Sequence, residues 1–220
     1  LKCYNQIPIS RGLGSSSAAI VGGLLAGNNL LKSPLSSNQL LQLASKQDGH
    51  PDNVAATLYG NCQLVIDNKS TLFSSTIPVP SNLKAICFIP DDSMPTNQAR
   101  KLLPEKINMR DAVHNISRVS LLVKSFITND LSNLSLATED KLHQPFRAKI
   151  YPLMNDFFKA SLIAGARSVF LSGSGPTIIA LADEKIKSIT YQIRKIAKTH
   201  SVNGDIRIVS ISTKGAHIKT

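Results

Sequence analysis

Residues 8–18 read Pro-Ile-Ser-Arg-Gly-Leu-Gly-Ser-Ser-Ser-Ala, and this stretch decides the fold of the chain. The residues before it alternate loosely as in a strand, and residues 18–31 are small and apolar as in a buried helix. Gly12 and Gly14 permit left-handed backbone angles and close approach to a ligand. A helix that begins here directs its N–H groups and positive dipole end at the loop. The stretch therefore predicts a phosphate-binding loop between a strand and a helix.

Two common phosphate loops do not match this stretch. The Walker A pattern requires a Gly-Lys-Ser/Thr sequence, which is missing, and the dinucleotide fingerprint requires glycine where Ser17 stands. Ser15, Ser16 and Ser17 instead supply hydroxyl groups, which can bind phosphate oxygens or magnesium. The alternative is that the glycines and serines simply cap a core helix.

A second polar cluster reads Asp-Gly-His-Pro-Asp-Asn over residues 48–53. Two carboxylates, one imidazole and one amide fall within six positions, and Gly49 and Pro51 favour a turn that gathers them. Phosphoryl transfer requires a metal ligand and a group that orients the attacking hydroxyl, and this cluster could supply both. The alternative is a turn whose polar side chains satisfy only their own backbone.

Two arginines and a second glycine-rich loop complete the candidate residues. Arg100 follows Thr96-Asn97-Gln98-Ala99, and Arg147 ends Leu142-His143-Gln144-Pro145-Phe146. Arginine presents a planar fork that suits a carboxylate, although a single arginine is more often a solvated surface charge. His143 is expected to be a structural histidine near a helix end. Residues 171–177 read Leu-Ser-Gly-Ser-Gly-Pro-Thr, which predicts a close backbone approach to a ligand or a plain hairpin.

These strings resemble the motifs of the GHMP kinases, a superfamily named for galactokinase, homoserine kinase, mevalonate kinase and phosphomevalonate kinase. Residues 8–18 fit its phosphate-loop pattern PxxxGLGSSxA. The strings DGHPDNV, LHQPFR and SGSGPT, at residues 48–54, 142–147 and 172–177, are similar to those of its homoserine kinase branch. The motifs follow one another in the family's order over essentially the whole chain.

The resemblance implies an α+β fold of two domains. Residues 1–80 would form an ATP-binding domain like domain 2 of ribosomal protein S5, and residues 81–220 a ferredoxin-like domain. The Ser-, Thr-, Asn- and Pro-rich residues 67–82 mark the expected boundary. Family members have several strands before the phosphate loop, so we expect the first domain to lack its opening strands.

The resemblance also implies transfer of the ATP γ-phosphoryl group to the hydroxyl of L-homoserine, with Mg²⁺ as cofactor. Ser16 and Asp48 would hold the metal, although the family usually has glutamate at position 48, which is one methylene longer. Asp48, Asp52 and Asn53 would be catalytic; whether Asp52 acts as a base is left open. The ATP phosphates would contact Pro8, Ser10, Arg11, Gly12, Leu13, Gly14, Ser15, Ser16 and Ser17. Homoserine would contact His50, Asp52, Asn53, Thr96, Arg100, Arg147, Gly173 and Ser174.

The amino-acid composition limits the class of protein, its location and its partners. The 220 residues are 42% hydrophobic and 18% charged, as in a globular protein, and no apolar run is long enough to cross a membrane. Three cysteines without CxxC spacing indicate free thiols and a cytoplasmic location. The net charge of +11 raises a nucleic-acid-binding module as an alternative. Its basic residues are scattered and aromatics are only 5%, so neither nucleic acid nor membrane is an expected partner.

Three expectations stay open at this stage. A homodimer is one of them. Another branch of the superfamily, such as a mevalonate kinase, is the alternative activity, although it gives no reason for the Asp-Gly-His-Pro-Asp-Asn turn or for both arginines. An inactive relative that binds nucleotide is the third, and the aspartate at position 48 is the one hint toward it.

Overall fold

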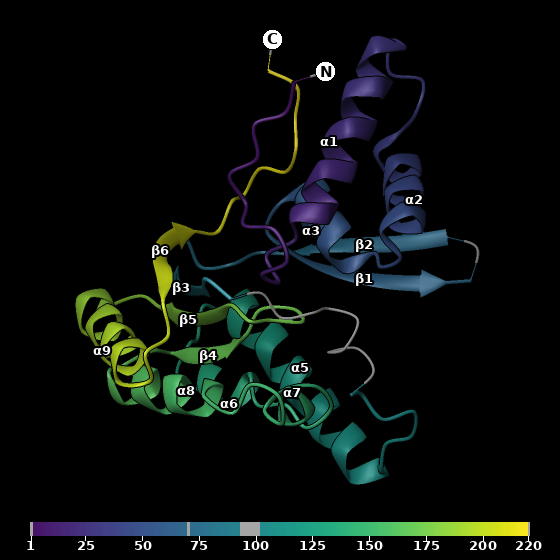
Figure 1. Cartoon of the computed structure of the whole chain (residues 1–220). Coiled ribbons are helices and arrows are strands. Elements are labelled where there is room, and N and C mark those ends of the chain that lie inside the picture. Colours follow the sequence, from purple (N-terminus) through teal and green to yellow (C-terminus); the bar gives the residue numbers. More distant parts are fainter. Residues whose placement is uncertain (1, 70, 93–101, 220) are drawn as a thin grey trace. The chain divides into compact units, whose positions relative to one another are not determined.

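The computed structural model describes residues 2–69, 71–92 and 102–219, and these form two compact units (Figure 1). The first unit contains residues 2–9, 14–79 and 211–219, and the second contains residues 10–13 and 80–210. Both units mix helices with antiparallel strands, so the expected α+β class is confirmed. In the described part of the chain no helix is long and apolar enough to cross a membrane.

The first unit packs three helices against a two-stranded hairpin, shown in purple and blue in Figure 1. Its core consists of helix residues such as Val21, Leu41 and Val54, which are at most 2% exposed. Val65 and Leu72 of the hairpin pack against this cluster from neighbouring strands. The elements are α1 (Ser15–Leu30), α2 (Ser37–Asp48), α3 (Asp52–Tyr59), β1 (Cys62–Asn68) and β2 (Thr71–Ile77).

Helix α2 begins at a reciprocal cap formed by Ser36 and Gln39. The Ser36 hydroxyl accepts a hydrogen bond from the Gln39 backbone N–H at 3.4 Å, and the Gln39 side chain accepts one from the Ser36 N–H at 2.8 Å. This reciprocal pair satisfies two donors that the helix itself leaves unpaired. It fixes where α2 starts, and therefore where its last residue, Asp48, lies.

The segment after residue 210 packs with the first unit, whereas the predicted division places it in the domain 81–220. The Asn61 N–H donates to the Ser212 carbonyl oxygen at 2.7 Å, and the Ala216 N–H donates to the Thr57 carbonyl oxygen at 2.8 Å. These long-range bonds satisfy backbone groups on both sides, which is why the segment follows α3 and β1 and not the second unit.

The second unit is an antiparallel sheet in the order β4-β5-β3-β6, with α8 and α9 on one face. Phe88 of β3 stacks on Phe157 of α8 with ring centroids 4.7 Å apart, and Ile189 and Ile193 of α9 are fully buried in the same core. The elements are β3 (Lys84–Pro90), α5 (Met109–Ile127), α6 (Leu134–Ala137), α7 (Gln144–Arg147), α8 (Met154–Ile163), β4 (Ser168–Leu171), β5 (Ile178–Ala182), α9 (Ile186–Thr199) and β6 (Gly204–Ser210).

Two predicted elements differ from the structure. Residues 67–82 include strand β2, although their composition suggested a linker. Residues 2–9, expected to form a strand, make no strand pairing among the described residues. Each difference lies where polar or short segments gave a weak periodic signal.

Candidate active site

Helix α1 begins inside the first glycine-rich loop. Gly14 is its N-cap residue, with φ of +73°, and within the described chain no side chain caps the helix there. The first helical bond runs from the Ala18 N–H to the Gly14 carbonyl oxygen at 3.0 Å. The N–H groups of Ser15, Ser16 and Ser17 precede that bond, so the start of this 16-residue helix offers uncapped donors to an anion.

The carboxylate of Asp48 faces the hydroxyl groups of this first turn. Ser16 Oγ donates to Asp48 Oδ1 at 2.8 Å, and Ser17 Oγ donates to Asp48 Oδ2 at 2.6 Å. Ser17 is buried, whereas Ser16 is exposed. Although aspartate is shorter than the glutamate usual in the family, its carboxylate reaches both hydroxyls. Ser16 and Asp48 therefore place two hard oxygen donors side by side, as Mg²⁺ prefers.

The turn between α2 and α3 brings Asn53 to the same place. Gly49 ends α2 with φ of +85°, and α3 begins at Asp52, whose carboxylate accepts the Asn53 N–H at 2.7 Å. A Cβ atom built on Gly14 would lie 3.8 Å from the Asn53 side chain. The structure thus gathers residues 14–17, Asp48 and Asn53 in the first unit, with Asp52 and Asn53 exposed.

Residues 10–13 contact the second glycine-rich loop, residues 171–177. The Ser172 hydroxyl donates to the Gly12 carbonyl oxygen at 2.7 Å, and the Thr177 N–H donates to the Arg11 carbonyl oxygen at 3.4 Å. A Cβ atom on Gly12 would lie only 2.1 Å from the Ser172 carbonyl oxygen. The sequence suggested that Gly12 admits a ligand; the structure shows that it admits another part of the chain.

Arg11 uses its side chain to hold this segment in place. Its Nε donates to the Pro90 carbonyl oxygen at 2.8 Å, and its Nη2 donates to the Asp91 carbonyl oxygen at the end of β3. These contacts direct the guanidinium to backbone oxygens. Contact of Arg11 with ATP stays a prediction.

Arg147 is buried in the second unit, with 1% of its surface exposed. Its Nε donates to His143 Nε2 at 3.2 Å, four residues earlier. Burial, followed by the charge of Arg147, holds the pKa of His143 below its usual value. A neutral imidazole is what this contact requires, because a protonated ring would have no lone pair to accept the bond.

Asp140 holds the backbone from which Arg147 projects. Its carboxylate accepts the N–H groups of Leu142, His143 and Gln144 and the side-chain amide of Asn115. Burial raises the Asp140 pKa, but these bonds outweigh it and leave the pKa below its usual value. Sequence reasoning missed Asp140, although an aspartate just before a short helix is a typical capping signal.

Gln144 connects the same segment to the second glycine-rich loop. Its Oε1 accepts the Leu171 N–H at 2.9 Å, immediately before Ser172. Gly173 and Ser174 lie in that loop, and Gly173 has φ of +54°. The second unit thus holds Arg147, Gly173, Ser174 and Leu13, whereas Pro8 and His50 belong to the first. Thr96 and Arg100 lie outside the described residues.

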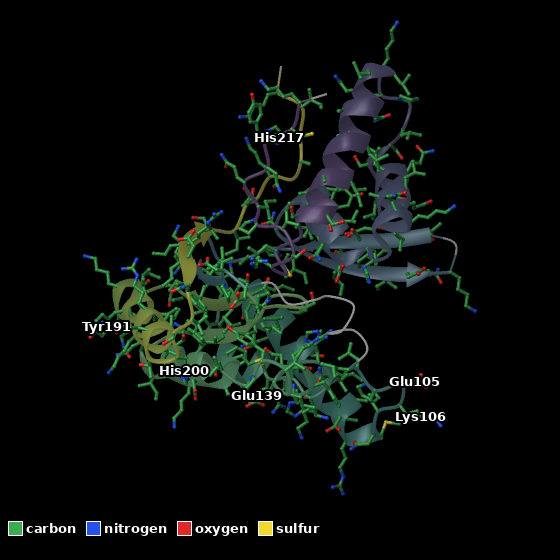
Figure 2. All side chains as sticks on the ribbon, in the orientation of Figure 1. Glu105, Lys106, Glu139, Tyr191, His200 and His217 are labelled. Atoms are coloured by element: carbon green, nitrogen blue, oxygen red, sulfur yellow. The ribbon has the colours of Figure 1, made fainter. Side chains whose placement is uncertain are left out.

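The remaining histidines have structural partners. His114 Nε2 lies 3.7 Å from Glu139, which also accepts a hydrogen bond from Arg118, and His200, the residue that follows α9, pairs with Asp156 of α8 at 2.9 Å. Glu139 and His200 are labelled in Figure 2. His217 Nδ1 lies 2.9 Å from the Gly215 carbonyl oxygen.

Comparison with known proteins identifies the class. Residues 1–61 match the GHMP kinases N terminal domain, and residues 122–198 match the GHMP kinases C terminal domain. The homoserine kinase of Petrotoga mobilis is 43% identical over 99% of this chain and 71% of its own length. The homoserine kinase of Caldanaerobacter subterraneus is 38% identical over 99% of this chain and 70% of its own length.

Solved structures agree with the sequence matches. A homoserine kinase from Cytophaga hutchinsonii superposes with a TM-score of 0.89 at 32% identity, covering 96% of this chain and 69% of that one. The mevalonate kinase of L. major superposes with a TM-score of 0.70 at 16% identity, over 94% of this chain and 68% of that one, and shows a shared fold only.

These matches define an ATP-dependent kinase of the GHMP superfamily that acts on an alcohol group. Within that superfamily, the chain belongs to the homoserine kinase family.

Proposed function

We propose that this protein transfers the γ-phosphoryl group of ATP to the side-chain hydroxyl of L-homoserine and forms O-phospho-L-homoserine. The observation that carries the proposal is the contact of Asp48 with the hydroxyls of Ser16 and Ser17 at the uncapped start of α1. An anion site and a carboxylate next to each other suit a nucleotide phosphate together with its cation. The family relationship supports the choice of homoserine.

The phosphates of ATP would bind at the N-terminus of α1. The N–H groups of Ser15, Ser16 and Ser17 and the positive end of the helix dipole supply attraction for negative charge. Gly14 leaves the approach open because it has no side chain. Residues 10–13 are fixed by contacts of their own, so they would shape the loop, while the helix start would supply most donors.

Mg²⁺ fits the donor set of Ser16 and Asp48, whose oxygens lie 2.8 Å apart. Bound there, the ion would neutralise charge that develops on the phosphoryl oxygens. Ser17 keeps Asp48 oriented through its second carboxylate oxygen. The first unit therefore supplies both the anchor for the phosphates and the ligands for the ion.

Homoserine would bind through its charged ends and its hydroxyl. Asp52 and Asn53 are exposed at the start of α3, where they can contact the ammonium and the hydroxyl groups. Arg147 suits the carboxylate, together with Arg100, Thr96 and His50, and Gly173 and Ser174 would adjoin the substrate. Because Arg147 is 1% exposed, the proposal includes a local rearrangement in the second unit that admits the carboxylate.

Asp52 has two candidate roles, which a substitution separates. Its carboxylate accepts the Asn53 N–H, so it also helps to order the first turn of α3. A loose phosphoryl-transfer transition state requires positioning more than a strong base. Asp52→Asn keeps the shape of the side chain and removes its basicity, so near-normal turnover would exclude the base role.

A substrate panel with coupled detection of ADP tests the proposed activity. We expect ADP release with L-homoserine and none above background with mevalonate, and chelation of Mg²⁺ should stop the reaction. Phosphorylation of mevalonate but not of homoserine would contradict the proposal. Binding of ATP without turnover of either alcohol would favour the inactive relative instead. A homodimer, a cytoplasmic location and the absence of nucleic-acid and membrane partners stay predictions.

A further inference from the structure

The segment from Asp140 to Arg147 contains a histidine that the proposed chemistry does not use. His143 lies one helical turn before Arg147, and its Nε2 accepts the Arg147 Nε–H at 3.2 Å. Both residues are at least partly buried, and Arg147 is almost completely so. A buried guanidinium needs acceptors, since taking a charge out of water without them is costly.

We propose that His143 is a positioning residue: it accepts the Nε–H of Arg147 and so orients the guanidinium toward the carboxylate of the amino-acid substrate. This inference rests on the proposed function, because it assigns the carboxylate to Arg147. With Nε occupied by His143, a two-pronged contact with a carboxylate would use the two Nη groups. The histidine thereby sets which edge of the guanidinium faces the substrate.

The surroundings of His143 hold the backbone that carries its ring. Its backbone N–H donates to Asp140 Oδ2 at 2.9 Å, so the start of α7 is tied to that carboxylate. The neighbouring Gln144 accepts the Leu171 N–H, which ties the same residues to the end of β4. The backbone under His143 and Arg147 is therefore fixed at two points before any substrate binds.

Protonation of His143 would break its hydrogen bond with Arg147. A charged His143 could no longer accept the Nε–H and would place a second positive charge beside Arg147. In the part of the chain that the structure describes, Arg147 lowers the pKa of His143 and Asp140 raises it, with burial as the largest cause of the net lowering. The neutral form is thus favoured at neutral pH, and the orientation should be lost as pH falls through the lowered pKa.

Three variants test the role. His143→Leu removes the acceptor and should raise KM for homoserine about tenfold, with KM for ATP and kcat nearly unchanged. His143→Gln places an acceptor at a similar reach and should keep KM for homoserine within about threefold of the parent. His200→Gln, in a histidine that pairs with Asp156 away from Arg147, is the matched control and should behave as the parent protein.

The parent protein itself gives a test that needs no substitution. We expect KM for homoserine to rise as pH falls below the usual histidine pKa of about 6.5, and the rise should be absent in His143→Gln. A KM that stays flat from about pH 8 down to the onset of acid unfolding would overturn the positioning role, as would an unchanged KM in a folded His143→Leu.

Arg147→Met distinguishes this inference from the proposed function. If that variant raises KM for homoserine while the His143 variants and the pH profile do not, the inference fails and the site assignment survives. If Arg147→Met leaves KM for homoserine unchanged, the assignment of the carboxylate to Arg147 fails and the inference fails with it. Should His143→Leu not fold, His143→Gln and the pH profile still decide the question.

Discussion

The two halves of the first glycine-rich loop are held by different forces. Residues 10–13, the front half, are held by a close backbone approach of Gly12 to Ser172 and by the Arg11 side chain, which donates to backbone carbonyl oxygens at the end of β3. Residues 14–17, the rear half, are held through side chains, with two hydroxyls donating to Asp48. The front half should therefore be most sensitive to added atoms and less so to loss of the Arg11 donors, whereas the rear half should be sensitive to loss of the Asp48 charge and of the serine donors.

The largest effect should come from adding a methyl group to the front half. Gly12→Ala would bring a Cβ atom to 2.1 Å from a backbone oxygen at φ of +72°. Left-handed strain and overpacking together should lower the free energy of unfolding by about 3 kcal/mol. Thermal unfolding should show a fall in Tm of about 10 °C.

Gly14→Ala is the matched control for that experiment. Its φ of +73° is nearly the same, but the nearest atom to its Cβ would be a side-chain carbon at 3.8 Å. Only the left-handed strain applies, so the loss should be about 1 kcal/mol. Equal losses in the two variants would show that strain, and not the contact with Ser172, makes the front half sensitive.

The next effect concerns charge in the rear half. Asp48→Asn keeps an acceptor for the serine hydroxyls and removes the negative charge, so kcat/KM should fall about a hundredfold and the dependence on Mg²⁺ should weaken. Asp48→Glu keeps the negative charge at this position and should retain most of the activity. The measurement is a Mg²⁺ titration of the coupled assay, and full activity in Asp48→Asn would remove Asp48 from the metal site.

A smaller effect should follow from loosening the front half. Arg11→Met removes the donors to the Pro90 and Asp91 carbonyl oxygens and should lower the free energy of unfolding by about 1–2 kcal/mol. Arg110→Met changes an exposed arginine of α5 and should stay within about 0.5 kcal/mol of the parent. Urea unfolding measures both, and equal midpoints would mean that Arg11 does not anchor the loop.

The smallest effect separates the two serines of the rear half. Ser17 is 1% exposed, so Ser17→Ala should lower the free energy of unfolding by about 1 kcal/mol through the lost bond to Asp48. Ser16 is exposed, so Ser16→Ala should change stability less and activity more. The opposite pattern in unfolding and turnover measurements would mean that Ser17, and not Ser16, lies beside the ion.

The sequence was informative wherever the motif was local. The helix after the first loop and the turn before Asp52 both follow from residues close together in the chain, and each is found where it was expected. Strand β2 was missed because four of its seven residues are serine or threonine, which gives it the composition of a loop. In polar stretches, the local sequence pattern therefore predicts where a helix or strand begins better than it predicts which of the two forms.

Long-range contacts could not be predicted from one sequence. Gly12 and Ser172 are 160 positions apart, and nothing in either string indicates that their backbones meet. The partner of Arg147 lies only four residues away, yet the sequence favoured a structural histidine, since a histidine near a helix end usually has that role. Thr96 and Arg100 stay predictions because they lie outside the described residues.

The order of the segments along the chain has a consequence for synthesis. The first unit includes residues 211–219, whereas residues 80–210 of the second unit form an uninterrupted run inserted within it, with Lys84 of β3 directly opposite Ser210 of β6. During synthesis, residues 80–210 therefore emerge from the ribosome before residues 211–219, which belong to the first unit. The second unit can close its sheet first, and the first unit, which carries Asp48 and the start of α1, is completed last.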